Sequence, residues 1–141
     1  MKKVRFQLSQ AYFAAPGLRV MKLRGDTEGA AGPGRFVEVS APGFFLRRPF
    51  SVCGVEGDEL TLAVKLAGRG TKALHELAPG AQLELLTDMF PGRAAIGITE
   101  CQAALGIDRR TLLADRRFPA RHIGNKYTVS LTELARWMVQ R

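Results

Sequence analysis

Residues 59–73 read ELTLAVKLAGRGTKA, and this stretch separates two very different folds. Every second position from 60 to 66 is leucine or valine, while the positions between them are polar or small, which is the pattern of a strand with one buried face. The glycines that follow, read from Gly68 to Ala73 with Asp88 about 20 residues on, imitate the dinucleotide-binding fingerprint of a Rossmann fold. We exclude that fold, because its strands are buried on both faces and nearly all apolar. The helix expected next, over residues 71–77, is also too short for a parallel crossover, which needs about a dozen residues.

The other segments of the first two-thirds of the chain repeat this strand pattern between turns of glycine and proline. The alternation predicts further strands at residues 4–8, 18–20, 36–39, 49–55 and 82–86. Ala15-Pro16-Gly17 predicts a turn, Glu56-Gly57-Asp58 a hairpin, and residues 25–34 a glycine-rich loop. Strands this short and this evenly spaced favour an antiparallel barrel over a parallel sheet.

The first candidate site is Arg47-Arg48-Pro49-Phe50-Ser51 at the start of one predicted strand. Pro49 cannot donate a hydrogen bond to a neighbouring strand, so one side of the strand is open to a ligand. An arginine fork matches the diphosphate of a dinucleotide. The alternation of side chains puts Ser51 on the face opposite Arg48 unless the strand bends at the proline. The alternative is a pair of arginines on a solvated edge.

The second candidate site runs from Lys65 to Lys72 and includes Gly68-Arg69-Gly70-Thr71 between a strand and a helix. Glycines allow a close approach of the backbone to a ligand, and the start of a helix favours an anion. These two features together predict a phosphate-binding turn.

Three segments in this order resemble the electron-transfer subunit of bacterial dihydroorotate dehydrogenase, in the ferredoxin-reductase superfamily. They are Gly34-Arg35-Phe36-Val37, Ala41-Pro42-Gly43-Phe44-Phe45-Leu46-Arg47-Arg48-Pro49-Phe50-Ser51-Val52-Cys53 and Gly68-Arg69-Gly70-Thr71. The resemblance covers roughly residues 3–88 and implies a six-stranded Greek-key barrel with one helix that binds FAD.

The same resemblance assigns roles to the residues of both candidate sites. It places Arg48, Pro49, Phe50 and Ser51 on the flavin and ribityl-phosphate side, and Gly70 and Thr71 at the diphosphate. Lys65 belongs to this cofactor-binding set and ends the triplet Ala63-Val64-Lys65, where the family usually has Leu-Tyr-Arg. The tyrosine of that triplet, a stacking surface, is absent here.

Members of this family continue into a nicotinamide-binding domain and a cysteine cluster for a [2Fe-2S] centre, and we expect neither here. Cys53 and Cys101 are the only cysteines, far apart and without a CxxC motif. They predict no metal site and no disulfide framework, and we expect both to be small buried residues. The chain therefore lacks a complete catalytic set and is at most a partial oxidoreductase component.

The pattern becomes helical after Phe90-Pro91-Gly92. Thr99 and Gln102 predict a capping box at the start of a helix, and Gly106 predicts its end. Asp108 is a predicted N-cap for a second helix over residues 109–115.

A hairpin and a third helix are expected to follow. Residues 121–129 predict a hairpin that turns at Gly124-Asn125. Ser130 and Glu133 predict a further capping box. The last helix has an apolar stripe of Leu131, Leu134, Trp137 and Met138.

Residues 96–141 resemble the excisionase-like helix-turn-helix family. The matching segments are Ala103-Ala104-Leu105-Gly106-Ile107, Arg110-Thr111, Phe118-Pro119-Ala120, Ile123-Gly124-Asn125-Lys126-Tyr127 and Leu134-Ala135-Arg136-Trp137. A recognition helix that opens with Arg109, Arg110 and Thr111 suits the major groove of DNA. Further candidate contacts, mostly to phosphates, are Arg116, Arg117, Arg121 and Lys126. The alternative is an arginine-rich solvated face on a small protein-interaction domain.

Charge and hydropathy limit the classes of partner and the cellular location that we expect for this protein. The net charge is +8, of which residues 93–141 contribute +5 and the longer first part +3, so the C-terminal third is the more basic. The sequence has no apolar run long enough to cross a bilayer and no signal-peptide pattern after Met1, so we expect a cytoplasmic protein without membrane contacts.

These observations predict an α+β protein: a six-stranded antiparallel Greek-key β-barrel with one short helix, followed by a small winged helix-turn-helix. The expected division is a barrel at residues 1–90, a joint at 91–95 and the winged module at 96–141. The first function hypothesis is a protein that binds double-stranded DNA and whose barrel binds FAD, docks a protein partner or self-associates. The alternative is a truncated FAD-binding electron-transfer subunit related to pyrimidine biosynthesis, without its NAD and [2Fe-2S] domains.

Overall fold

The computed structural model describes residues 1–31, 35–44 and 47–140, without the side chain of Val139. Of the segments used above, Gly34, Phe45 and Leu46 lie outside the described residues, and so does the end of the predicted loop at 25–34. The described part of that loop contains the short 3-10 helix η1, Glu28–Ala30.

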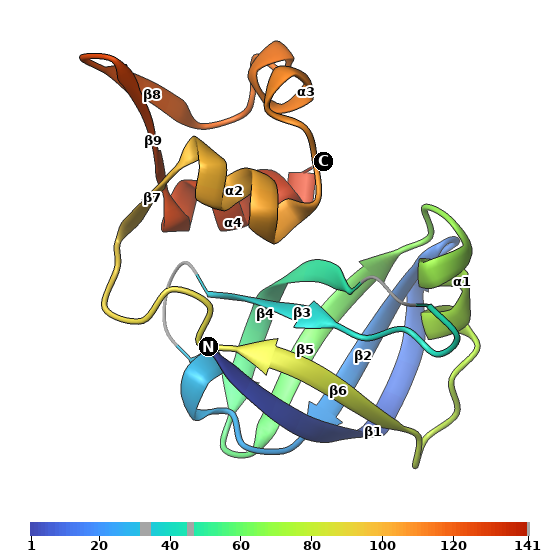
Figure 1. Cartoon of the computed structure of the whole chain (residues 1–141). Helices are drawn as coiled ribbons and strands as arrows, with labels where there is room; N and C mark the ends of the chain where they lie inside the picture. Colours follow the sequence, from blue (N-terminus) through green and yellow to red (C-terminus); the bar gives the residue numbers. More distant parts are fainter. Residues whose placement is uncertain (32–34, 45–46, 141) are drawn as a thin grey trace.

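The first part of the chain is a closed barrel of antiparallel strands in the order β1-β2-β5-β4-β3-β6 (Figure 1). The strands are β1 (Lys2–Ala15), β2 (Leu18–Arg24), β3 (Phe36–Val39), β4 (Arg48–Glu56), β5 (Glu59–Lys65) and β6 (Gln82–Thr87). The predicted antiparallel barrel is therefore confirmed.

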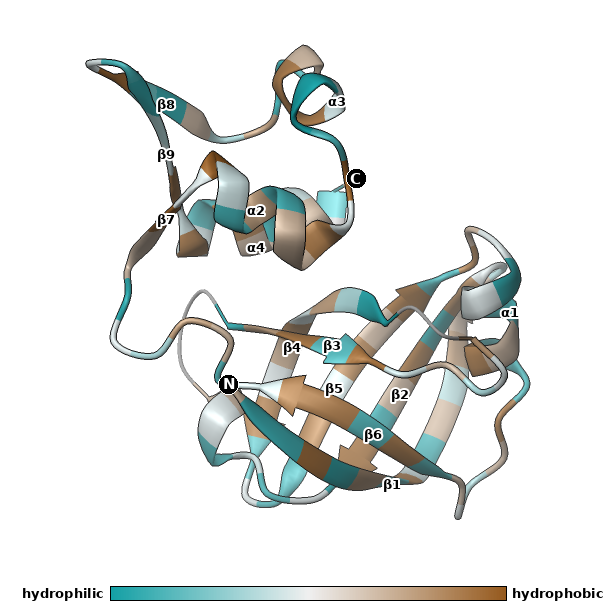
Figure 2. Cartoon of the chain, viewed as in Figure 1, coloured by the Kyte–Doolittle hydropathy of each residue, from teal (hydrophilic) through white to brown (hydrophobic). Residues whose placement is uncertain are grey.

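Alternation along β5 is the physical reason for this fold. Leu60, Leu62 and Val64 are completely buried in the barrel, whereas Thr61 and Ala63 between them are half-buried. Leu62 pairs with Met21 of β2, which is also in the core. Figure 2 shows the same alternation of apolar and polar positions on the neighbouring strands.

Strand β1 is much longer than the strand predicted at residues 4–8, because it pairs with two neighbouring strands. Its first part pairs with β6 and its second part with β2, with irregularities in the β2 pairing after Leu8 and after Phe13. Such bulges bend a strand and increase its twist, which allows it to leave one partner for another. The strand ends at Ala15, and Gly17 lies in the predicted turn that follows, with a φ of 73° that favours glycine.

Helix α1 (Arg69–His75) begins two residues before the predicted Thr71. The backbone N–H of Lys72 already donates to the Gly68 carbonyl, so Thr71 lies inside the first turn of the helix.

The second part of the chain combines three helices with a three-stranded sheet in the order β7-β9-β8. Its elements are β7 (Ala95–Gly97), α2 (Ile98–Leu105), α3 (Arg109–Ala114), β8 (Ala120–Ile123), β9 (Lys126–Ser130) and α4 (Leu131–Gln140). The predicted hairpin and the three predicted helices are present. Strand β7 was missed, because it has only three residues and pairs with β9, far along the chain.

The helix ends follow local hydrogen bonds, and one prediction was wrong. The backbone N–H of Gly97 donates to the Glu100 carboxylate (3.2 Å), so α2 begins at Ile98 and the Thr99–Gln102 capping box does not form. Gly106 ends this helix in the left-handed conformation as expected, with a φ of 66°. Asp108 caps α3 by accepting from the N–H of Arg110 (3.0 Å).

The two parts of the chain touch along β3 and β4. Phe36 points out of the barrel and is only 2% exposed, because it packs into the apolar core formed by the C-terminal helices and sheet. Phe90, beside the predicted joint, also packs on Phe36. Helices α2 and α4 lie next to the barrel, with α3 and the β8–β9 hairpin beyond them (Figure 1). The division into a barrel at residues 1–90, a joint at 91–95 and a winged module at 96–141 stays a prediction.

Candidate functional site

A groove of about 860 Å³ brings the predicted barrel-site residues together. It lies where the start of β4, the end of β5 and the turn before α1 meet. The predicted residues that line it are Arg48, Pro49, Phe50, Ser51, Lys65 and Thr71. The remaining predicted residue, Gly70, lies directly behind one of them.

Gly70 is buried against the side chain of Arg48. A Cβ added at Gly70 would lie 2.9 Å from the Arg48 Nε, closer than real Cβ contacts allow. Glycine at this position therefore lets the guanidinium of Arg48 lie against the turn. Two segments that the sequence analysis treated as separate sites form one site.

Thr71 shapes the turn through its hydroxyl. Its Oγ1 donates to the Gly68 carbonyl (3.0 Å) and accepts from the backbone N–H groups of Ala67 (2.8 Å) and Gly68 (3.0 Å). These three bonds hold the loop between β5 and α1 closed. The hydroxyl hydrogen of Thr71 is thus used inside the protein.

Ser51 lies on the face of β4 that the C-terminal part of the chain covers. It pairs with Phe36 of β3, is 9% exposed, and its Oγ donates to the Ala135 carbonyl of α4 (2.7 Å). The hydroxyl oxygen keeps lone pairs that can accept a further hydrogen bond. Arg48 pairs with Val39 instead, yet both side chains line the same groove.

The groove is positively charged. Arg48 and Lys65 are exposed, and no carboxylate of a described residue lies within 4.0 Å of either cation. The lining residues described here include no aspartate or glutamate. This arrangement favours an anionic ligand, because two unpaired cations at its wall attract negative charge.

The wall that faces the barrel residues was not predicted from the sequence. Leu105, Gly106 and Ile107 at the α2–α3 turn line it together with Met138 of α4. No local sequence signal connects these positions with residues in the barrel, since only the packing of the C-terminal part on β4 brings them there. Further lining residues that were not predicted are Pro16, Gly17, Leu18 and Ala63, whereas Leu66, Ala67 and Gly68 belong to the predicted segment 65–72.

The prediction that both cysteines are buried was half right. Cys101 has no exposed surface, and burial raises the pKa of its thiol to about 11. Cys53 is exposed and lines the groove, because β4 has an irregularity between Val52 and Gly54.

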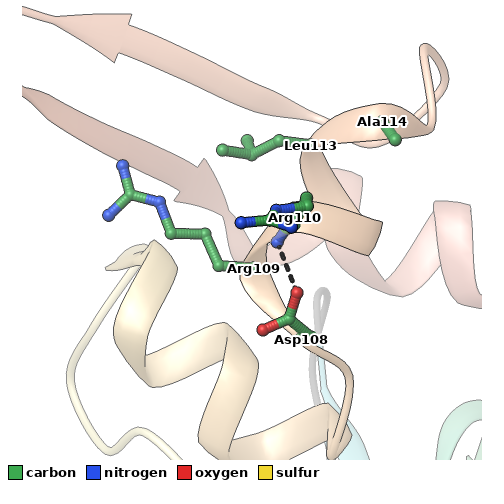
Figure 3. Close-up of a pocket in the computed structure, with 5 residues that line it drawn as sticks. All are labelled: Asp108, Arg109, Arg110, Leu113 and Ala114. Carbon is green, nitrogen blue, oxygen red and sulfur yellow. Dashed lines mark hydrogen bonds between the residues drawn. The ribbon is translucent and has the colours of Figure 1, made fainter.

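The predicted DNA-contacting residues all lie on the surface of the C-terminal part, and each of them is exposed. Figure 3 shows Arg109 extending from the start of α3 toward the hairpin and the backbone of Arg110 bonded to Asp108. The Arg109 guanidinium lies over the ring of Tyr127, 5.4 Å from its centroid.

The register of the hairpin separates these residues into two groups. His122 and Tyr127 pair and share one face, on which Arg109 lies. Arg121 and Lys126 lie on the other face, because they occupy alternate positions on their strands. The structure therefore does not bring all the predicted DNA-contacting residues onto one flat patch.

Two of these cations have carboxylate partners. Arg117 lies 3.5 Å from Asp115, and Arg121 lies 3.5 Å from Glu133. Within residues 1–31, 35–44 and 47–140, no carboxylate lies within 4.0 Å of the other predicted cations, Arg109, Arg110, Arg116 and Lys126. Those four charges are free for an external anion.

The described residues lack two other features. They contain no group of three or more histidine, cysteine, aspartate or glutamate side chains that could hold a metal ion. No helix in the part of the chain that the structure describes is long and apolar enough to span a membrane.

The chain is similar in sequence to curated proteins named dihydroorotate dehydrogenase B (NAD(+)), electron transfer subunit. The one from Streptococcus mutans is 33% identical over 95 residues, which cover 64% of this chain and 37% of that protein. The one from Clostridium perfringens is 30% identical over 65 residues, which cover 46% of this chain and 26% of that protein. The matched regions thus span only 26% and 37% of these relatives. No family model matches the chain.

Several solved structures share the fold of the barrel, among them two reductases and a flavohemoglobin. The ferredoxin reductase of carbazole 1,9a-dioxygenase has a TM-score of 0.55 at 23% identity, over 65% of this chain and 33% of that one. The barrel has a ferredoxin-reductase-like fold. Phthalate dioxygenase reductase has a TM-score of 0.52 at 19% identity, over 60% of this chain and 29% of that one. A flavohemoglobin from Malassezia yamatoensis with bound FAD and heme has the same TM-score and identity, over 62% of this chain and 25% of that one.

Proposed function

We propose that the barrel binds FAD in the groove and that the protein is a flavin-binding electron-transfer component. The observation that carries this proposal is the Arg48 guanidinium, which lies against Gly70 in a groove whose described lining has two cations and no carboxylate. A dinucleotide has a diphosphate that an arginine fork can bind through two hydrogen bonds. The groove volume, about 860 Å³, is also within the range of small-molecule sites.

Five barrel residues have tasks in this proposal. Arg48 and Lys65 bind the diphosphate, and Gly70 leaves room for the guanidinium. Ser51 accepts a hydrogen bond from a polar edge of the flavin, while the half-buried Phe50 contributes apolar surface. Bound flavin supplies the ability to accept and release electrons.

The electron-transfer role is supported by the relatives. Both curated proteins are electron transfer subunits by name, and phthalate dioxygenase reductase is described as a modular structure for electron transfer from pyridine nucleotides to [2Fe-2S]. We therefore expect a redox protein as the partner, and a dihydroorotate dehydrogenase is the partner that the relatives suggest.

The test is a titration of the purified protein with FAD, followed by flavin fluorescence. We expect saturable binding, and protection of the exposed Cys53 thiol from a thiol reagent as the groove fills. Cys101 stays unreactive at neutral pH, because burial raises the pKa of its thiol to about 11. A protein that neither binds FAD nor protects Cys53 refutes the flavin assignment.

DNA binding by the C-terminal part is a second candidate function. The specific observation in its favour is that Arg109, Arg110, Arg116 and Lys126 are exposed and lack a carboxylate partner among the described residues. The order helix, turn, helix, hairpin, helix also fits the winged helix-turn-helix that we propose for residues 96–141.

Two single substitutions test this candidate function. The side chains that they remove lie in different elements, so their loss should affect DNA binding differently. Lys126→Ala, beside the hairpin turn, should weaken binding to all duplexes alike and lower the salt slope by about one unit. Arg110→Ala, in the first turn of α3, should cost about 1–3 kcal/mol on a preferred site and much less on random DNA.

A matched control for both variants is Arg5→Ala, which removes an exposed arginine from the barrel. Fluorescence anisotropy with labelled duplexes at several salt concentrations measures the affinities. If the parent protein binds no duplex at low salt, the C-terminal part is a protein-interaction module instead.

A further inference from the structure

The ligand groove has two chemically different walls. The barrel wall has the cations Arg48 and Lys65, whereas the wall from the C-terminal part has Leu105, Ile107 and Met138. None of these three side chains has a hydrogen-bond donor, and the thioether of Met138 is only a weak acceptor. The polar and the apolar halves of the groove thus come from different parts of the chain.

The apolar wall is held firmly against the barrel. Ser51 donates a hydrogen bond to the Ala135 carbonyl (2.7 Å), one helical turn before Met138 in α4. Phe36 of β3 is buried in the same apolar core as Leu105. These contacts between the two parts of the chain hold the apolar wall in place relative to the barrel wall.

We infer that the C-terminal part completes the flavin site and that Leu105, Ile107 and Met138 are ligand-binding residues. This inference rests on the proposed FAD function and adds the residues that contact the ring system. The diphosphate of the ligand lies toward Arg48 and Lys65, because those are the only cations among the described residues of the lining. In this inference the planar flavin ring, and not the adenine, lies along the uncharged wall formed by Leu105, Ile107 and Met138.

Ile107 is the best position for a test. It lies in the turn between α2 and α3, it is half-exposed, and it lines the groove beside Gly106. Ile107→Ser therefore removes apolar surface from the wall. Because Ile107 also packs against the C-terminal core, the fold of this variant is checked through Trp137. Ile123→Ser is the matched control, because Ile123 is 65% exposed at the tip of the β8–β9 hairpin and does not line the groove.

The experiment measures the affinities of FAD, riboflavin and ADP for the full chain and its variants. Ile107→Ser should weaken FAD and riboflavin about tenfold, because less apolar surface contacts the ring, and change ADP by less than about twofold. Arg48→Ala should weaken FAD and ADP and leave riboflavin nearly unchanged, since riboflavin has no phosphate. Met138→Ala is the second variant and should act in the same direction as Ile107→Ser.

The outcomes separate this inference from the proposed function. If the parent binds FAD and both wall variants bind FAD as the parent does, the barrel alone forms the site and the inference is wrong. If the parent binds none of the three ligands, both the proposed function and the inference fail. The emission of Trp137 checks that each variant keeps the C-terminal fold, because this buried tryptophan is the only one in the chain.

Discussion

At the scale of single residues, the pair of Arg48 and Gly70 has the clearest consequence. The guanidinium occupies the space that any side chain larger than glycine would need at residue 70. The arginine pair before Pro49, which predicts Arg48, and the glycine-rich turn that predicts Gly70 are separate sequence signals. A Cβ at residue 70 would therefore force the Arg48 side chain to move.

Replacement of Arg48 should weaken FAD binding with little effect on stability, because the side chain is exposed. Loss of a charge-assisted contact to the diphosphate should cost about 1.5–3 kcal/mol, or roughly ten- to a hundred-fold in affinity. Gly70→Ala should act in the same direction, because its Cβ would displace the guanidinium. Fluorescence titration measures both affinities, with Arg5→Ala as the control. Unchanged affinity in Arg48→Ala would contradict the role of this residue.

At the scale of elements, α4 connects the C-terminal core with the barrel. Trp137 is 5% exposed, and its ring packs edge-on against Phe118 with 5.0 Å between the ring centroids. Its indole N–H donates to the Asp115 carboxylate (3.1 Å). The pKa of the Asp115 carboxyl is lowered, mostly by the hydrogen bond from the backbone N–H of Arg117 and next by the hydrogen bond from this indole. Both bonds favour the charged carboxylate.

Fluorescence of Trp137 should report on the packing of this helix. We expect a blue-shifted emission maximum in the native protein, because the indole is buried, and a shift to longer wavelength on unfolding in urea. Phe118→Ala should move the native maximum toward longer wavelength, whereas Ile123→Ala, at an exposed site, should not. A maximum like that of tryptophan in water, unchanged by urea, would show that α4 does not pack in this way.

At the scale of the whole molecule, the barrel and the C-terminal part share buried surface at Phe36. This side chain belongs to a barrel strand and to the core of the other part, so each part shields apolar surface of the other. The two parts are therefore expected to unfold together in the parent protein.

Phe36→Ala should uncouple the two parts. Truncation of a buried phenylalanine lowers the free energy of unfolding by about 3–5 kcal/mol. In this protein the substitution weakens the contact between the barrel and the C-terminal part. In urea, Trp137 fluorescence follows the C-terminal part and far-UV circular dichroism follows the whole chain. The two curves should coincide for the parent and separate for Phe36→Ala. A control is Phe13→Ala, since Phe13 is 59% exposed on β1. Coincident curves in Phe36→Ala would mean that other contacts are sufficient for coupling.

Local patterns in the sequence were sufficient to predict most elements. The alternation at 60–66 distinguishes an antiparallel barrel strand from a Rossmann strand, and the structure has that barrel. Gly17, Gly106 and Gly124 all have a positive φ at predicted turns or helix ends. These predictions depend on neighbouring residues only, so no tertiary information was needed.

Only the tertiary structure decided how the predicted pieces combine. Strand β7 forms because residues 95–97 meet β9, more than thirty positions away in the chain, and three residues have no strand signal of their own. Cys53 is exposed because of an irregularity in β4, and Ser51 has a partner on α4. The apolar wall of the groove likewise comes from packing of the C-terminal part on the barrel. The physical reason is the same each time: periodicity and capping act within a few residues, whereas a groove depends on surfaces that are brought together by burial.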